Sequence, residues 1–90
     1  MNYRFRAART FWRSFNKLPL EQQEAARQAF RIFRTNPFDP RLRPHKIHRL
    51  SAHYGPTIHA VDIKGDLRAT FYLEGDTVWS VDIGAHDIYR

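Results

Sequence analysis

The spacing of apolar residues divides the chain into a helical first half and a strand-rich second half. Residues Asn2 to Arg6 alternate polar and aromatic side chains, which predicts a short half-buried strand. From Ala7 the apolar positions follow a helical period and predict two helices, near residues 8–17 and from Pro19 to Arg34. The pair Asn36-Pro37 ends the second helix, because the residue before a proline avoids the α region. Two helices joined this closely are expected to form an antiparallel hairpin.

Glycine and proline divide the rest of the chain. Prolines crowd the segment from Asn36 to Pro44, which is therefore expected to be an extended, stiff connector. Four glycines follow at intervals of ten, ten and nine residues, a spacing typical of turns between antiparallel strands. Lys64-Gly65-Asp66 and Glu74-Gly75-Asp76 are the predicted hairpin tips. The predicted strands span residues 45–50, 57–63, 67–74 and 77–83.

Alternation along these strands assigns side chains to two faces of one sheet. In the third strand the side chains predicted to face the core are Leu67, Ala69, Phe71 and Leu73, and those predicted to face away are Arg68, Thr70, Tyr72 and Glu74. The apolar set of the last strand is Trp79, Val81 and Ile83. In the first long strand an inward Ile47 turns Lys46 and His48 to the open face. The chain is thus predicted to be an α+β fold with an N-terminal strand, a two-helix hairpin on one sheet face, and a four-stranded antiparallel sheet.

Composition narrows the classes of function. The 90 residues carry 15 Lys+Arg against 9 Asp+Glu, a net charge of +6, and no cysteine. Without cysteine there is no disulfide scaffold or thiolate metal site, and no histidine spacing resembles a metal motif, so neither metal nor cofactor is expected. No apolar run approaches the roughly 20 residues of a membrane helix, so we expect one cytoplasmic domain over residues 1–90 with no membrane partner. Most of the cations are arginines, which favours a polyanionic partner.

Short motifs in a fixed order give the chain a resemblance to a known family. After the N-terminal strand and the helical hairpin come Asn36-Pro37-Phe38, His45-Lys46-Ile47, Leu67 to Phe71, and a C-terminal stretch from Asp82 to Tyr89. In this order they resemble the RelE/ParE superfamily of type II toxin–antitoxin systems, most closely the branch with a terminal G-T-H-D-x-x-Y signature. The resemblance implies a microbial RNase-type fold that cleaves mRNA at the ribosome. It also implies a cognate antitoxin that silences the toxin in a hetero-oligomer.

Cleavage of RNA by its own 2′-hydroxyl requires a base, an acid and cations around the phosphorane, but no metal. Histidine suits both proton transfers because its pKa lies near neutrality. The resemblance makes His86 the candidate general acid, and His45 or His48 is the candidate base. The cations expected to stabilise the transition state are Lys46, Arg49 and Arg68.

The predicted RNA contacts include aromatic and polar residues. Tyr72 lies on the open, basic sheet face, which suits stacking on bases. By resemblance, Tyr89 matches a terminal aromatic residue that stacks on a base, and His59 and Asp66 match an internal His…Asp pair. The candidate RNA-binding residues are therefore Arg49, Tyr72, Tyr89, His59 and Asp66.

Structural roles remain open for several of these residues. His59 shares its parity with Val61 and Ile63, which also fits a half-buried packing position. Arg68 also fits an ion pair across the strands with Glu74 or Asp82.

Three functions remain open on the sequence. The first is a ribosome-dependent endoribonuclease toxin, the second a ParE-like, non-enzymatic poison of DNA gyrase, and the third a basic binding module retained for its antitoxin. In each case the antitoxin is expected to be acidic and partly disordered when free, because a +6 surface favours an acidic segment that folds upon it.

Overall fold

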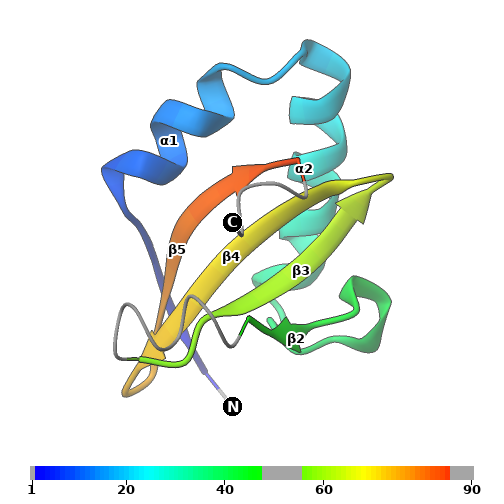
Figure 1. Ribbon diagram of the computed structural model, residues 1–90. Coiled ribbons are helices and arrows are strands. Elements are labelled where there is room, and N and C mark those ends of the chain that lie inside the picture. The colour runs from blue at the N-terminus through cyan, green and yellow to red at the C-terminus, as the bar shows by residue number, and fades with distance from the viewer. Residues whose placement is uncertain (1, 48–55, 86–90) are drawn as a thin grey trace.

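The architecture is that of a computed structural model, which describes residues 2–47 and 56–85. One five-stranded sheet has the order β1-β5-β4-β3-β2 (Figure 1). The strands are β1 Arg4–Ala7, β2 His45–Lys46, β3 His59–Lys64, β4 Leu67–Glu74 and β5 Thr77–Gly84. The helices are α1 Arg9–Asn16, α2 Leu20–Phe33 and the short 3₁₀ turn η1 Pro40–Leu42. The predicted α+β order is confirmed, and the sheet is mixed because β1 runs parallel to β5.

Aromatic rings fill the space between the helices and the sheet. Phe11 and Phe15 of α1 and Phe33 of α2 are buried in one cluster with Phe71 of β4. The rings of Phe33 and Phe71 meet edge to face with centroids 5.0 Å apart. Buried rings contribute large apolar areas, and edge-to-face pairs add to them, so this cluster is the main source of stability in a chain of this size.

The two helices meet through side chains rather than along their backbones. The rings of Phe11 and Phe30 lie 5.5 Å apart, and the guanidinium of Arg27 lies 5.4 Å from the ring centre of Phe15. In Figure 1, α2 lies behind the sheet while α1 lies beside β5. Thr10 fixes α1 there, because its hydroxyl donates to the Val81 carbonyl at 2.6 Å.

The segment between α2 and β2 is a compact turn, so the predicted extended connector is wrong. The Asp39 carboxylate accepts a hydrogen bond from the backbone N–H of Arg41 at 2.9 Å and pairs with its guanidinium at 2.9 Å. The side-chain hydrogen bond from Arg41 lowers the pKa of Asp39. Leu42 is buried, and Arg43 has a φ of 49°, which turns the chain into β2. Proline fixes φ near −65°, a value that suits a 3₁₀ turn as well as an extended chain, so prolines alone could not distinguish the two.

Both predicted hairpin tips are confirmed. Gly65 and Gly75 occupy the turns with φ of 58° and 63°. Two-residue hairpins require such left-handed backbone, which glycine adopts without a steric penalty. The strand between them, β4, has the predicted bounds.

A bulge in β5 makes the predicted apolar set of that strand wrong. Phe71 pairs with Ser80 and Thr70 with Asp82, so Val81 is the extra residue. One extra residue reverses the alternation. As a result Ile83 packs in the core cluster, whereas Trp79, opposite Tyr72, faces away from it.

The register of β2 also corrects a predicted face. His45 pairs with Ala60, and Lys46 pairs with His59. Paired residues share a face, so Lys46 lies on the helix side of the sheet and His45 on the opposite side. Residues 48–50, which the sequence assigned to the same strand, lie outside the described residues.

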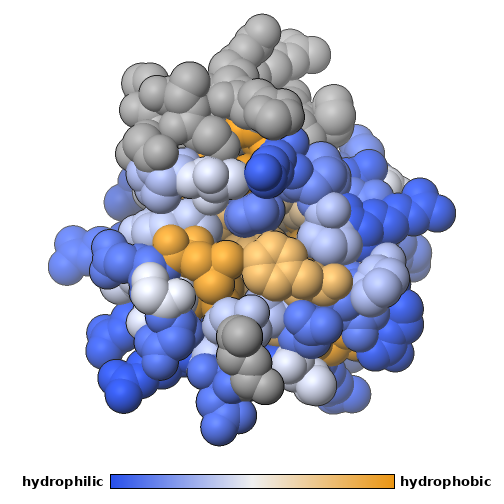
Figure 2. All heavy atoms as spheres, turned by 90° about the horizontal axis from the view of Figure 1, so that it is seen from below, coloured by the Kyte–Doolittle hydropathy of each residue, from blue (hydrophilic) through white to orange (hydrophobic). Residues whose placement is uncertain are grey.

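The face of the molecule seen from below is mainly hydrophilic (Figure 2). Seen from below, charged and polar residues surround a small hydrophobic area (Figure 2). Among the described residues, no helix is long and apolar enough to cross a membrane.

Candidate functional site

Four of the predicted site residues lie outside the described residues. They are His48, Arg49, His86 and Tyr89. Their assigned roles in acid–base catalysis and RNA binding therefore stay predictions. The remaining six can be placed in the structure.

The face of the sheet opposite the helices, called here the open face, carries a row of stacked side chains. Tyr72 of β4 and Trp79 of β5 lie opposite each other, with ring centroids 6.4 Å apart and planes 16° from parallel. The guanidinium of Arg6 in β1 lies 5.9 Å from the ring centre of Trp79. Aromatic rings and a guanidinium plane are the groups on which unpaired bases stack. The predicted position of Tyr72 on this face is confirmed.

Trp79 and Arg6 are members of this row that the sequence reasoning did not select. Trp79 was assigned to the core because the bulge at Val81 leaves no mark in the sequence pattern. Arg6 had a visible signal, since it alternates with Phe5 in the first strand and Phe5 packs against the core. The alternation therefore predicts that Arg6 faces away from the core. It does not predict that Arg6 lies next to Trp79.

The middle of the open face is buried. Ile58, Ala60 and Thr70 are each at most 2% exposed. Beside them lies a hollow of about 470 Å³ whose lining includes Tyr72, Ile58 and Val81. The prediction that Thr70 faces away from the helices is right, since Thr70 pairs with Ala60 and Asp82 on that face. The prediction that this face is uncovered is wrong at Thr70, whose side chain is buried.

Arg68 is engaged in the hairpin that joins β3 and β4. Its Nε lies 2.7 Å from the Asp62 carboxylate in the opposite strand. Its Nη1 donates to the carbonyls of Gly65 at 2.7 Å and Leu67 at 3.1 Å. The ion-pair partner is thus Asp62, neither of the two acids considered on the sequence. These contacts make Arg68 a structural group of the hairpin end and give no support to its predicted catalytic role.

His45 lies at the edge of the open face. Its Nδ1 is 2.9 Å from the carbonyl of Arg43, the residue with the left-handed backbone. A carbonyl only accepts, so Nδ1 carries a proton, and in the neutral ring the lone pair is then on Nε2. That tautomer is the one a general base at Nε2 requires.

His59 and Lys46 form a second group, on the helix side of the sheet. His59 stacks on Phe71 with centroids 5.2 Å apart and meets Phe38 edge to face at 5.2 Å. Burial, and then the charge of Lys46, lower the pKa of His59. The half-buried packing role that the sequence left open is therefore the one observed for His59. Lys46 is exposed beside it, and the sheet separates both residues from the Tyr72–Trp79 row.

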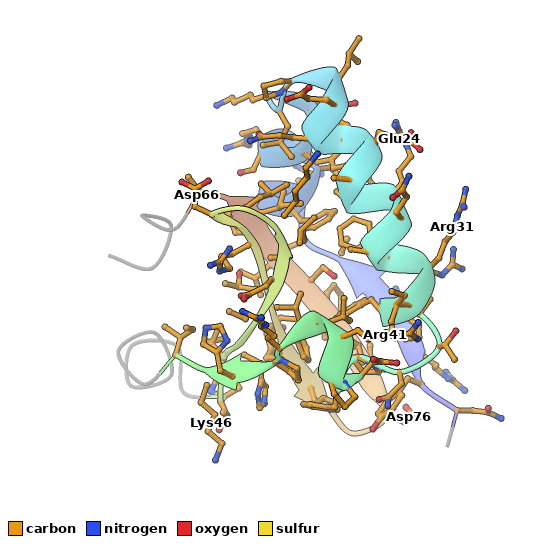
Figure 3. All side chains as sticks on the ribbon, turned by 90° about the vertical axis from the view of Figure 1, so that its right-hand side faces the viewer. Glu24, Arg31, Arg41, Lys46, Asp66 and Asp76 are labelled. Atoms are coloured by element: carbon orange, nitrogen blue, oxygen red, sulfur yellow. The ribbon has the colours of Figure 1, made fainter. Side chains whose placement is uncertain are left out.

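The predicted pairing of His59 with Asp66 is not formed. Asp66 lies in the turn beyond the end of β3, while His59 begins that strand. Six strand residues span about 20 Å. Figure 3 likewise shows Asp66 and Lys46, the residue paired with His59, at opposite ends of the sheet.

No group of three His, Asp or Glu side chains within residues 2–47 and 56–85 is placed to hold a metal ion. The groups that the described open face presents are the stacked rings of Tyr72 and Trp79, the guanidinium of Arg6 and the imidazole of His45.

Comparison with known proteins finds a similarity of fold. No protein-family model matches the chain, and no curated protein matches its sequence. Among solved structures, RelE in the archaeal RelE–RelB complex from Pyrococcus horikoshii OT3 superposes with a TM-score of 0.71 at 14% identity, covering 94% of this chain and 96% of that one. A copper-bound mutant toxin from Helicobacter pylori gives a TM-score of 0.61 at 18% identity, covering 96% and 97%. The predicted RelE-type fold is thus confirmed over nearly the whole chain.

Proposed function

We propose that this chain, which has the fold of the RelE toxin, is the toxin of a type II toxin–antitoxin system and cleaves translated mRNA on the ribosome. The observation that carries the proposal is the superposition on archaeal RelE over 94% of this chain and 96% of that one. A match over nearly the whole of both chains supports a function carried by this one domain.

The open face supports RNA as the substrate. Tyr72, Trp79 and Arg6 form a stacked row that suits unpaired bases, which are exposed in mRNA but not in a duplex. A hollow lies directly beside Tyr72. Stacking on this row would fix the message across the sheet, and a fixed geometry is what an intramolecular attack by the 2′-hydroxyl needs.

In the proposed reaction, Nε2 of His45 takes the proton of the 2′-hydroxyl, and the 2′-oxygen attacks the adjacent phosphorus. The bond from phosphorus to the 5′-oxygen breaks, and His86 returns a proton to that oxygen. The products are a 2′,3′-cyclic phosphate and a free 5′-hydroxyl. Each proton transfer contributes roughly 10²–10⁴ in rate, so either histidine is open to test by a single substitution.

An acidic antitoxin is the proposed partner. The archaeal neighbour is a RelE–RelB complex, and the net charge of +6 on this chain favours an acidic protein.

The test is controlled expression in bacteria with mapping of the 5′ ends of a reporter message, made with and without a ribosome-binding site. Wild type is expected to stop growth and to cut only the translated message. His45→Ala and His86→Ala are expected to reduce cutting by at least about 100-fold at equal soluble level. His59→Gln serves as the matched control, because His59 lies on the other side of the sheet, and it is expected to cut as wild type does.

Growth arrest without cut message would contradict the proposal. If DNA breaks linked to gyrase accumulate instead, the ParE-like alternative replaces it. If wild type has no effect on growth or on messages, the binding-module alternative does.

A further inference from the structure

Next to the stacked row of the open face lies a second row, whose side chains form hydrogen bonds. Glu74 pairs with Thr77, and Thr77 pairs with Arg4. Paired residues share a face, and Glu74 follows Tyr72 by two residues in β4, so this row lies on the open face about 7 Å from the stacked row. In Figure 1 this end of β4 is at the lower left. A group stacked on Tyr72 therefore has hydrogen-bonding side chains close to its edge.

The hollow beside Tyr72 lies on the side of the ring that faces away from Trp79. One face of the Tyr72 ring stacks toward Trp79, which does not line the hollow. Ile58 and Pro56 do line it, and they precede β3, the strand that flanks β4 on the side away from β5. Its volume of about 470 Å³ is within the range of small-ligand sites, roughly 300–1,000 Å³. A planar base in this hollow extends the stacked row by one ring.

Glu74 gives this hollow a wall that accepts hydrogen bonds. Of the described residues that line it, Glu74 is the only one with a charge. Its side chain is exposed, and within residues 2–47 and 56–85 its carboxylate forms no ion pair. An ionised carboxylate only accepts hydrogen bonds, through two oxygens that lie side by side. The hollow therefore favours a base whose edge offers donors.

Guanine is the RNA base that matches a carboxylate best. Its Watson–Crick edge carries two adjacent donors, N1–H and the N2 amino group, which together pair with both oxygens of one carboxylate. Adenine and cytosine offer one amino donor next to a ring acceptor, and uracil offers one N–H between two carbonyls. With these three bases a carboxylate oxygen faces an acceptor and loses a hydrogen bond, which weakens binding.

We propose that this hollow binds a guanine of the message, which stacks on Tyr72 and is recognised by the carboxylate of Glu74. Arg4 and Arg6, the exposed cations of the two rows, offset the repulsion between this carboxylate and the flanking phosphates. Glu74 touches the base and not the reacting atoms, so its role is to determine specificity. The inference deepens the function proposed above, and it rests on that function in so far as the guanine belongs to translated mRNA.

The register of the sheet places this hollow at a fixed distance from His45. His45 pairs with Ala60, and Ala60 pairs with Thr70. Glu74 lies four residues, about 13 Å, further along β4 than Thr70. The recognised guanine is therefore a neighbour of the bond that is cut, at one position of the message.

The first test measures binding without cleavage. The probes are fluorescein-labelled 2′-O-methyl oligouridylates with a single central guanine or a single central adenine, in which methylation removes the attacking 2′-hydroxyl. Fluorescence anisotropy gives the affinity of each probe for wild type, Glu74→Gln and Asp76→Asn. Asp76→Asn is the matched control, because it removes an exposed carboxylate two residues away that does not line the hollow.

The ratio of the two affinities is the readout, because loss of a negative charge strengthens binding to any RNA. Wild type and Asp76→Asn are expected to bind the guanine probe about tenfold more tightly than the adenine probe, the discrimination of one bidentate pair. Glu74→Gln is expected to lose this preference or to favour adenine, since an amide presents one donor and one acceptor, as adenine does. Equal affinities in wild type, binding of neither probe, or an unchanged ratio in Glu74→Gln would overturn the proposal.

Mapping of 5′ ends on translated messages distinguishes failure of this inference from failure of the proposed function. Wild type is expected to cut where guanine stands at one fixed position near the cut, and Glu74→Gln is expected to lose that preference. Cleavage by wild type without a preferred guanine would overturn the inference and leave the proposed function standing. If wild type cuts nothing, the proposed function fails, while the binding ratios still decide which base the hollow selects.

Discussion

Phe71 and Tyr72 are neighbours in β4, yet they lie on opposite faces of the sheet and in different surroundings. Phe71 is buried against Phe33, Phe38 and His59. Tyr72 is half-buried and stacks on Trp79, which in turn meets Arg6. The helix side thus uses its rings to hold the fold together, while the open face presents rings at the surface. Aromatic content alone does not distinguish packing from recognition in this chain, because the same residue types serve both sides.

The histidines follow the same division. His59 lies among rings on the helix side, with a lowered pKa that keeps it neutral at pH 7. His45 is exposed at the edge of the open face, with its tautomer set by the Arg43 carbonyl. A histidine at the surface with a defined tautomer is suited to proton transfer, whereas one among rings is suited to packing.

Truncating the two neighbours in β4 gives the largest expected difference between the faces. Phe71→Ala is expected to lower the free energy of unfolding by about 3–5 kcal/mol, the cost of removing a buried ring. Tyr72→Ala, on the open face, is expected to cost about 1 kcal/mol. Urea denaturation followed by circular dichroism measures both. Equal losses would mean that the open face is a second core rather than a surface.

Breaking the ion pair at the hairpin end is expected to have a smaller effect. Arg68→Ala and Asp62→Ala are each expected to cost about 1–2 kcal/mol, because both side chains are mostly buried. The double variant should lose less than the sum of the two. Glu24→Ala, which removes the exposed partner of Arg27, is the control and is expected to change stability by no more than about 0.5 kcal/mol. If Asp62→Ala leaves stability unchanged, Arg68 is not held structurally and its predicted catalytic role regains support.

Acidification tests the packing role of His59. The folded chain lowers the pKa of His59 below its value of about 6.5 in the unfolded chain, so protonation favours unfolding. The stability that neutral His59 contributes is present above pH 6.5 and is lost as the pH falls through the folded pKa. In chemical denaturation at a series of pH values, His59→Gln should therefore show a weaker fall in stability below pH 6.5 than wild type. An identical slope in His59→Gln and wild type would contradict this assignment.

Replacing the left-handed Arg43 should produce the smallest change. Arg43→Gly is expected to raise the free energy of unfolding by about 0.5–1 kcal/mol, since glycine adopts a φ of 49° without steric cost. Arg41→Gly, two residues earlier, is expected to lower it, because the pairing with Asp39 is lost. If Arg43→Gly is more stable than wild type and still cuts RNA, the turn positions the chain and takes no direct part in the reaction. Thermal denaturation of the two variants measures the contrast.

The elements whose structure depends on a local residue pattern were predicted well from the sequence. The clean alternation of Leu67 to Glu74 gave the bounds and faces of β4, and the glycines gave both hairpin tips. Both helices begin and end one residue inside their predicted limits, because Pro19 and Pro37 mark where they stop and start. These features depend on residues close together in the chain.

The wrong predictions concern residues whose face or partner depends on a residue distant in the sequence. The face of Lys46 is set by pairing with His59, and the face of Trp79 by a bulge opposite Phe71 and Thr70. The Arg68 partner, Asp62, lies across a hairpin whose register shifts locally. None of these leaves a periodic signal within its own strand. The candidate site was consequently predicted less well than the fold, since it consists of side chains that different strands bring together.

The two tryptophans provide the most direct test of the claim that the open face binds the message. Trp79 lies in the stacked row of the open face, and Trp12 lies exposed on α1. In a reconstituted translation reaction, Trp79→Leu is expected to slow cleavage of the translated message roughly tenfold, the cost of one lost stacking contact. Trp12→Leu is expected to cut as wild type does. Unchanged cleavage by a folded Trp79→Leu, or a loss confined to Trp12→Leu, would contradict the assignment of RNA binding to the open face.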